Sequence, residues 1–135
     1  MRKTTGILHP QLSRIVSELG HTDLLVVTDA GLPIPQCVER VDLAYRPAEP
    51  TFLGVLDAVL ADVVIEGAIL ATEIRDHSPA LLQEILARLE RAGVTPQFVP
   101  HAEFKATTRD ARAAVRSGEF TPYANIILQA GVAYK

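Results

Sequence analysis

The feature that most constrains the fold of this chain is an alternation of short apolar runs with longer amphipathic stretches. Leu24–Thr28 (LLVVT) is a continuous apolar run, which is typical of a strand buried on both faces. Further short strands are expected at 41–44, 63–65, 68–71, 97–99, 113–115 and 125–129. Strands that alternate with covering helices indicate an α/β protein, and we expect a three-layer α/β/α domain with a mostly parallel, mixed central sheet.

The helices between these strands are predicted from their apolar spacing and their end signals. Pro10 suits the first position of a helix whose apolar residues recur at i, i+3, i+4 and i+7, and Gly20 ends that helix. The clearest helix begins at Ser78-Pro79, with Ser78 as its N-cap, and ends before Gly93. Two more helices are expected at 51–60 and 103–111.

Composition limits the class of protein. A chain of 135 residues with 48% hydrophobic and 21% charged residues fits one globular domain spanning residues 1–135. The net charge is −3 and no run of Lys and Arg exceeds two residues, so we expect neither nucleic acid nor an anionic membrane as a partner. The one cysteine, Cys37, excludes an internal disulfide framework and is expected to be buried or inert.

Targeting and cofactor motifs are absent from the sequence. The N-terminal residues lack the apolar segment of a signal peptide, and no apolar stretch approaches the roughly 20 residues that span a bilayer. We therefore expect a soluble cytoplasmic protein. The chain has no G-x-G-x-x-G, no phosphate-binding G-x-x-x-x-G-K-[ST] and no G-x-S-x-G motif. Its four histidines show no i, i+4 pairing, so neither a metal nor an organic cofactor is expected.

The remaining polar residues of interest lie next to predicted strands, and one of them, Asp29, follows the carboxyl end of a strand, where open α/β sheets usually bind ligands. They are His21, Asp29, His101, Tyr123 and Asn125. Each also has a structural interpretation. His21 can cap a helix end, Asp29 can bond its own turn and Asn125 can cap another turn. His101 can neighbour a helix N-cap, and Tyr123 can be a buried aromatic with its hydroxyl satisfied. These residues alone predict a small-ligand site and specify no reaction.

Four segments nevertheless resemble the ribose/fucose mutarotase family. They are Gly20–Asp23 (GHTD), Asp29–Pro35 (DAGLPIP), His101–Lys105 (HAEFK) and Thr121–Val132 (TPYANIILQAGV). The resemblance extends from Gly6 to the C-terminus, and the segment Gly31-Leu32-Pro33 together with Ala124 favours the ribose branch. The segment 46–76 matches only in pattern and contributes no site residue.

The resemblance implies interconversion of the β-pyranose and β-furanose forms of D-ribose without a cofactor. Matched by position, His21 corresponds to the family's proton donor, and Asp29, His101, Tyr123 and Asn125 correspond to its sugar-binding residues. Histidine can give and take a proton near neutral pH, which suits ring opening and reclosure. The resemblance also implies a homo-oligomeric ring, commonly a decamer, with sites near subunit boundaries. The apolar C-terminal segment 126–134 suits burial in such an interface and equally suits burial within one chain.

Two other functions remain open at this point. A sugar-binding or transport-accessory protein would need the polar pocket but no proton-transferring histidine. An aldose–ketose isomerase commonly uses a metal or a dedicated carboxylate base, and the sequence shows no metal cluster.

Overall fold

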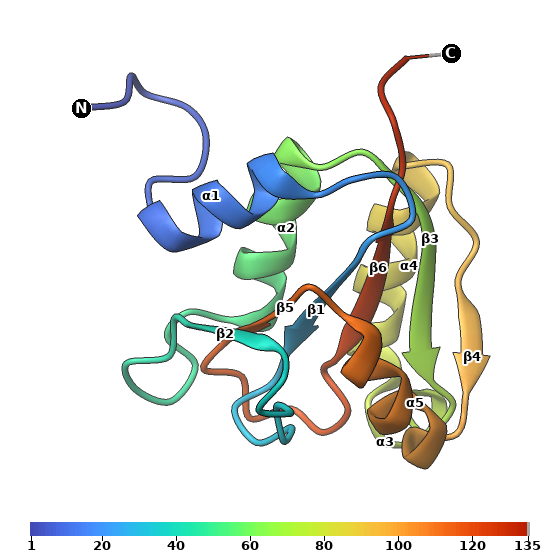
Figure 1. Cartoon of the computed structure of the whole chain (residues 1–135). Helices are drawn as coiled ribbons and strands as arrows, with labels where there is room; N and C mark the ends of the chain where they lie inside the picture. Colours follow the sequence, from blue (N-terminus) through green and yellow to red (C-terminus); the bar gives the residue numbers. More distant parts are fainter. Residues whose placement is uncertain (135) are drawn as a thin grey trace.

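A mixed sheet forms the centre of the computed structural model, which describes residues 1–134. Within these residues, six strands lie in the order β2-β5-β1-β6-β3-β4 (Figure 1). The strands are β1 (Leu24–Thr28), β2 (Glu39–Asp42), β3 (Ile65–Ala71), β4 (Gln97–Val99), β5 (Ala113–Arg116) and β6 (Ile126–Ala130). β6 runs antiparallel to its neighbours β1 and β3, whereas the other strand pairs are parallel. The mixed, mostly parallel sheet predicted from the sequence is confirmed.

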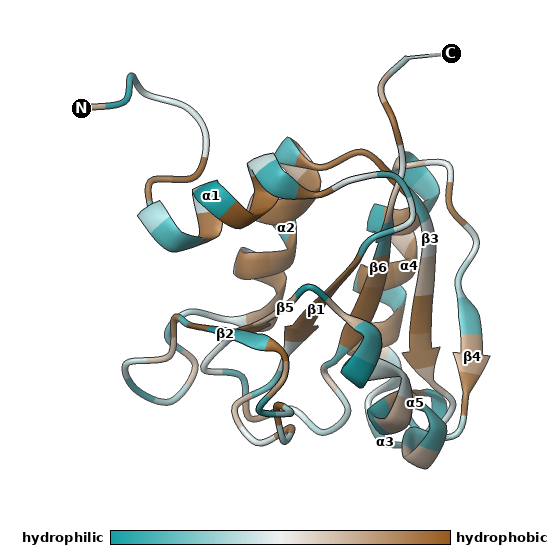
Figure 2. Cartoon of the chain, viewed as in Figure 1, coloured by the Kyte–Doolittle hydropathy of each residue, from teal (hydrophilic) through white to brown (hydrophobic). Residues whose placement is uncertain are grey.

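Helices cover the two faces of the sheet unequally. The helical segments are α1 (Pro10–Glu18), α2 (Phe52–Asp62), α3 (Ile74–His77), α4 (Pro79–Arg91), α5 (His101–Thr107) and a short 3-10 turn at Thr108–Asp110. The larger apolar core packs α1, α2 and α4 against one face. A smaller core packs α5 and the segment 32–38 against the other face. Figure 2 shows apolar residues along the central strands and on α2 beside them.

The local signals that begin and end the helices act largely as expected. Pro10 occupies the first turn of α1, and the Nδ1 atom of His9 accepts a hydrogen bond from the backbone N–H of Leu12 at 3.2 Å. Thr51 caps α2 in the same way, with its Oγ1 atom accepting from Gly54 N at 3.0 Å. These contacts satisfy N–H groups that the first helical turn leaves without a partner.

Ser78 departs from its predicted role as the side-chain cap of α4. It occupies the N-cap position, but its hydroxyl donates to the carbonyl of Pro122 at 2.7 Å instead of accepting from the helix. The residue is buried, and the hydrogen bond joins the start of α4 to the segment that precedes β6. The tertiary partner has therefore displaced the local one.

The two short strands expected on either side of Glu66-Gly67 are one strand, β3. Ile65 pairs with Ala130 and Gly67 pairs with Gln129, so Glu66 is an extra residue in a β-bulge. The expected interruption was wrong because a bulge bends a strand while its pairing with the neighbour continues. The four-residue helix α3 was also not predicted from the sequence.

The topology places several strand ends at one edge of the sheet. β1, β3 and β4 end at the edge near α3 and α5, and the antiparallel β6 begins there (Figure 1). We call this edge the carboxyl edge. The opposite edge, where β1 and β3 begin and β6 ends, is called the amino edge. The two edges carry different candidate residues.

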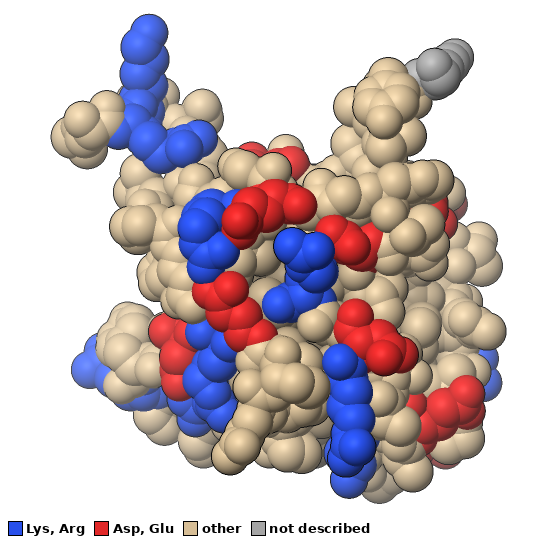
Figure 3. Space-filling view, in the orientation of Figure 1, with Lys and Arg blue, Asp and Glu red and all other residues tan. Residues whose placement is uncertain are grey.

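The surface around the sheet carries charges of both signs. Figure 3 shows Lys and Arg side chains interspersed with Asp and Glu side chains on one face of the molecule. Arg14 pairs with Glu18 on this protein's first helix, and Arg88 of α4 pairs with Asp57 of α2 at 2.6 Å. Mixed charge of this kind is the usual pattern of a solvated protein surface.

Candidate active site

Four of the five candidate residues line one pocket at the carboxyl edge. The pocket has a volume of about 290 Å³ and is bordered by Asp29, Gly31, Leu32, Pro33, His101, Lys105, Pro122, Tyr123 and Asn125. Asp29 follows β1, His101 follows β4, and Tyr123 and Asn125 precede β6. The strand order brings these ends together although up to 96 residues separate the side chains along the chain.

Asp29 and Asn125 form a reciprocal hydrogen-bonded pair. The Asn125 side-chain amide donates to Asp29 Oδ2 at 3.2 Å, and its carbonyl oxygen Oδ1 accepts from the Asp29 backbone N–H at 2.8 Å. The other carboxylate oxygen, Asp29 Oδ1, accepts from the backbone N–H groups of Gly31 and Leu32 at 3.0 and 2.8 Å. Asp29 is therefore a turn aspartate and a pocket residue at once, and its remaining lone pairs can accept from a sugar hydroxyl.

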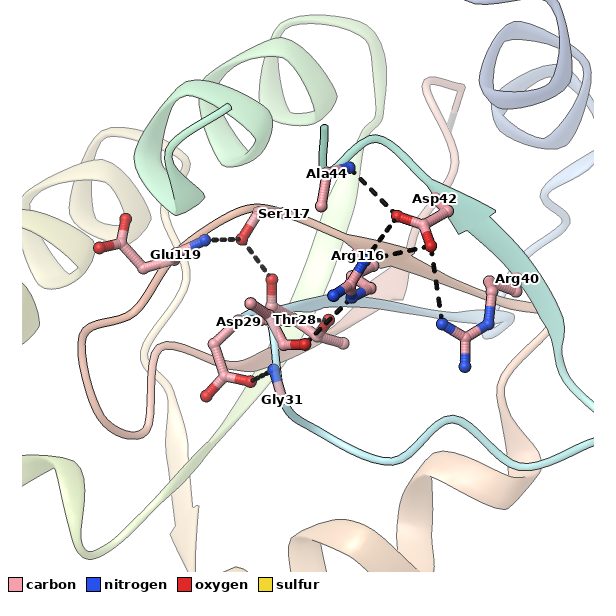
Figure 4. Close-up of polar contacts among 10 residues, drawn as sticks. Thr28, Asp29, Gly31, Arg40, Asp42, Ala44, Arg116, Ser117 and Glu119 are labelled. Atoms are coloured by element: carbon pink, nitrogen blue, oxygen red, sulfur yellow. Dashed lines mark hydrogen bonds and ion pairs between the residues drawn. The ribbon is translucent and has the colours of Figure 1, made fainter. Parts of the chain in front are cut away.

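A second network fixes the loop after β1 (Figure 4). Ser117 donates to the carbonyl of Thr28 from its hydroxyl at 2.5 Å and from its backbone N–H at 3.0 Å. Arg116 donates from Nε to the carbonyl of Ala30 at 3.0 Å and from Nη1 to the Asp42 carboxylate at 3.1 Å. These contacts hold the backbone on both sides of Asp29, so the carboxylate is pre-oriented for a ligand.

Tyr123 lies between two histidine rings. Its ring centroid is 5.1 Å from that of His101, in an edge-to-face arrangement, and 5.1 Å from that of His77. Its backbone has a φ of 61°, which is uncommon for a residue other than glycine. The hydrogen bond from Ser78 to Pro122 anchors the residue just before it, so α3, α4 and α5 together set the position of the tyrosine.

His101 is held by its backbone at the start of α5. Its N–H donates to both carboxylate oxygens of Glu73, at 3.0 and 3.1 Å. Its Nδ1 atom is buried and, in the described part of the chain, has no hydrogen-bond partner. A neutral imidazole carries its proton on one ring nitrogen and accepts a hydrogen bond at the other. The imidazole of His101 can therefore donate or accept a hydrogen bond with a ligand.

His21 lies at the amino edge, away from this pocket. It precedes β1, whereas Asp29 follows β1, and the five residues of that strand span roughly 16 Å. The imidazole is exposed, and its Nε2 atom lies 2.9 Å from Glu66 Oε2. The fold of one chain therefore does not bring His21 to the residues with which the sequence grouped it.

Two side chains that the sequence analysis did not select lie at this site: Lys105, which lines the pocket, and His77, which packs against Tyr123 beside it. Lys105 borders it one turn after His101, and no ion pair among residues 1–134 involves its ammonium group. The spacing of His101 and Lys105 on one helix, at i and i+4, was the available signal. His77 had no such signal, because its contact with Tyr123 depends on the path of α3.

Cys37 lies next to the pocket but outside it. It borders an open hollow of about 880 Å³ between the segment 33–37 and α5, which is lined largely by apolar side chains. Of the two expectations for Cys37, buried or inert, the structure contradicts burial, because the thiol is exposed, and its Sγ atom lies 4.0 Å from the carbonyl of Arg109. The hollow shares Pro33 and Lys105 with the candidate pocket.

Two further observations concern metals and membranes. Among residues 1–134, no three or more His, Cys, Asp or Glu side chains are grouped as metal ligands would be. In the same residues, no helix has both the length and the apolar character needed to cross a membrane.

Known proteins are similar to this chain in both sequence and fold. A D-ribose pyranase of Geobacillus kaustophilus is 50% identical over 132 residues, which cover 98% of this chain and 96% of the relative. The structure of Bacillus subtilis RbsD complexed with D-ribose matches with a TM-score of 0.88 and 41% identity, over 98% of this chain and 100% of that one. A fucose mutarotase of Streptococcus pneumoniae, solved with L-fucose, shares the fold at a TM-score of 0.81 and 23% identity, over 94% and 95% of the two chains.

The family assignment rests on nearly the whole length of the chain. The model of the RbsD / FucU transport protein family matches residues 2–133, which include the pocket at the carboxyl edge and His21 at the amino edge. The resemblance drawn from the four sequence segments is thereby confirmed. This chain belongs to the RbsD / FucU transport protein family.

Proposed function

We propose that this protein is a ribose pyranase, an isomerase that interconverts the β-pyranose and β-furanose forms of D-ribose. The observation that carries the proposal is the pocket formed by Asp29, His101, Tyr123 and Asn125. It occurs in a chain that is 50% identical to a D-ribose pyranase and 41% identical to a protein solved with D-ribose. The pocket offers hydrogen-bond donors and acceptors suited to a small polyhydroxylated ring.

The reaction needs only proton transfers. In ring opening, the ring oxygen gains a proton as its bond to C1 breaks, and the C1 hydroxyl loses a proton as it becomes a carbonyl. In ring closure, the C4 hydroxyl adds to C1 and gives up its proton while the carbonyl oxygen regains one. No atom is lost and nothing is oxidised, so an acid–base group and a site that orients the sugar are sufficient.

Within this proposal the pocket residues bind the sugar. The Asp29 carboxylate accepts from ring hydroxyls, and the imidazole of His101 donates to or accepts from a sugar hydroxyl. Asn125 keeps Asp29 in place from a buried position, with 1% of its surface exposed. The Tyr123 hydroxyl adds a further donor and acceptor.

His21 is proposed as the proton donor, acting in the pocket of a neighbouring copy of the chain. The length of β1 separates it from the pocket of its own chain, and its imidazole is 54% exposed. A homo-oligomeric ring, which we propose to be a decamer working in the cytoplasm, would supply the pocket. Each subunit would be a single sugar-mutarotase domain, and each complete site would contain residues from two subunits.

Saturation-transfer NMR on D-ribose tests the function directly. The wild-type protein should accelerate pyranose–furanose exchange, and His21→Ala should abolish the acceleration while circular dichroism shows an intact fold. Exchange at the wild-type rate in a folded His21→Ala protein would contradict the assigned role of His21. Ribose binding without any acceleration by the wild-type protein would instead identify a sugar-binding protein.

A further inference from the structure

The surroundings of His21 contain a carboxylate that the family resemblance did not single out. Glu66 Oε2 lies 2.9 Å from His21 Nε2, and the second carboxylate oxygen, Oε1, accepts from the side-chain amide of Gln129 at 3.0 Å. Gln129, Glu66 and His21 therefore form a chain of hydrogen bonds along the amino edge. None of the described hydrogen bonds uses the other ring nitrogen of His21, Nδ1.

The β-bulge in β3 explains why Glu66 can reach this position. Side chains alternate between the two faces of a strand, so regular pairing would direct Glu66 to the same face as Ala68, which packs in the helix-covered core. The extra residue at the bulge keeps Ile65 in that core and leaves Glu66 beside Gln129. Bulges commonly redirect a side chain next to an active site.

Gly67 leaves room for this arrangement, and Gly131 lies in contact with Glu66. A Cβ atom on Gly67 would lie 3.2 Å from Gln129 Oε1, closer than such contacts normally come. A Cβ atom on Gly131 would lie 3.4 Å from Glu66 Cβ and 3.5 Å from its Oε2 atom. Gln129, which donates to Glu66, thus packs directly over the backbone of Gly67, which carries no side chain.

A carboxylate that accepts from one nitrogen of an imidazole fixes which nitrogen carries the proton. We propose that Glu66 is a positioning residue for His21, so that Nε2–H points to Glu66 and Nδ1 exchanges the proton with the sugar. Nδ1 takes the proton of the C1 hydroxyl as that oxygen becomes a carbonyl, and the imidazolium so formed gives this proton to the ring oxygen as the C1–O bond breaks, while the Nε2–H bond stays intact. This inference rests on the role of His21 in the proposed function.

The tautomer can be measured without reference to activity. In protein labelled with 15N at histidine, the two ring nitrogens of neutral His21 are distinguished by long-range proton–nitrogen correlation, and His21→Ala identifies its signals among the four histidines. The wild-type protein should show the Nε2–H form. Glu66→Gln presents an amide of the same shape whose N–H can donate to Nε2, so His21 should change to the Nδ1–H form.

Kinetics provide the second readout. Glu66→Gln should lower kcat for ribose exchange by about 10- to 100-fold, a part of the 10²–10⁴-fold that a positioned acid–base group contributes, with KM changed less than about twofold. Glu66→Asp, which keeps the carboxylate, should recover part of the loss. Glu84→Gln, a glutamate that instead pairs with Arg88 on α4, serves as the matched control and should match the wild-type protein in both readouts.

The outcomes separate this inference from the proposed function. A folded Glu66→Gln protein with the wild-type tautomer, or with unchanged kcat, would overturn the role of Glu66. A wild-type protein that shows the Nε2–H form but does not accelerate exchange would instead overturn the proposed function. A loss in Glu66→Gln confined to KM would place Glu66 in sugar binding and overturn the positioning role as well.

Discussion

At the residue scale, the side-chain amide of Asn125 serves the fold and the pocket through the same atoms. It donates to the Asp29 carboxylate and accepts from the Asp29 backbone while almost wholly buried. A group of this kind has no water to replace a lost partner, so its removal affects both the loop and any ligand that the loop holds.

Asn125→Ala should therefore weaken ribose binding. It leaves the Asp29 N–H without its acceptor, which costs about 1–3 kcal/mol and corresponds to a factor of about 5 to 150 in affinity. His21→Ala should retain binding and lose exchange, since a proton donor acts mainly on the transition state. Calorimetric titration of ribose into both variants, with NMR exchange rates, checks this difference. Wild-type affinity in folded Asn125→Ala would show that the pair does not orient the sugar.

A second prediction at the same scale concerns metals. The proposed reaction uses imidazole and hydroxyl groups alone, so exchange activity should survive dialysis against EDTA at the rate of the untreated protein. The exchange rate is measured before and after dialysis, and again after adding Mg²⁺, Mn²⁺ or Zn²⁺. A loss that one of these ions specifically reverses would replace the cofactor-free mechanism with a metal-assisted one.

At the element scale, Glu119 links α2 to the segment that leads into the pocket. Its carboxylate accepts from the backbone N–H of Phe52 at 3.0 Å and from the Thr121 hydroxyl at 2.8 Å. Burial by itself would raise the pKa of Glu119, but the hydrogen bonds from Phe52 and Thr121 outweigh it and lower the pKa below its usual value. The ionised carboxylate therefore stabilises the folded state.

This lowered pKa predicts how stability depends on pH. The contribution of Glu119 is complete above the ordinary glutamate pKa of about 4.3 and is lost as the pH falls through the lowered folded value. Glu119→Gln should therefore have a lower Tm than the wild-type protein at pH 6, and the difference should shrink as the pH falls below about 4. Glu90→Gln, an exposed position on α4, should show no such convergence in the same calorimetric scans. A constant Tm difference across this range would contradict the pKa assignment.

At the scale of the whole molecule, the two edges of the sheet carry two parts of one proposed site. The pocket lies at the carboxyl edge and the pair of His21 and Glu66 lies at the amino edge. A rigid sheet cannot fold back to join them, so only a second chain can bring an amino edge to a carboxyl edge.

Mixed oligomers test this arrangement. His21→Ala and His101→Ala should each be inactive alone, because one lacks the proton donor and the other lacks a pocket residue. Co-expressed in equal amounts, they should recover about a quarter of the wild-type rate. A shared site needs an intact His21 from one chain and an intact His101 from its neighbour, and each of these has one chance in two. Mixed particles that show no exchange activity would contradict a site shared between two chains. A different affinity tag on each variant, with recovery of both tags in one particle, confirms that mixed particles are present.

The sequence by itself determined most of the elements. The run Leu24–Thr28 predicted β1 with the bounds that the structure has, and Pro10 and Pro79 marked the starts of α1 and α4. These predictions succeed because they depend on local properties. Apolar periodicity indicates which residues are buried, and proline has a fixed backbone φ angle, whatever the distant parts of the chain do. Asp29 and His101 were also recognisable as residues that follow strands.

Only the tertiary structure decided how these pieces are used. Glu66-Gly67 reads as an interruption in the sequence, and the pairing of β3 with β6 makes it a bulge that turns Glu66 toward His21. The hydroxyl of Ser78 caps nothing because Pro122, 44 residues away, offers a buried acceptor. His21 was grouped with the pocket residues and lies at the other edge of the sheet. Each outcome depends on which strands become neighbours. A local apolar pattern does not specify the neighbours of a strand, because they depend on the packing of the whole chain.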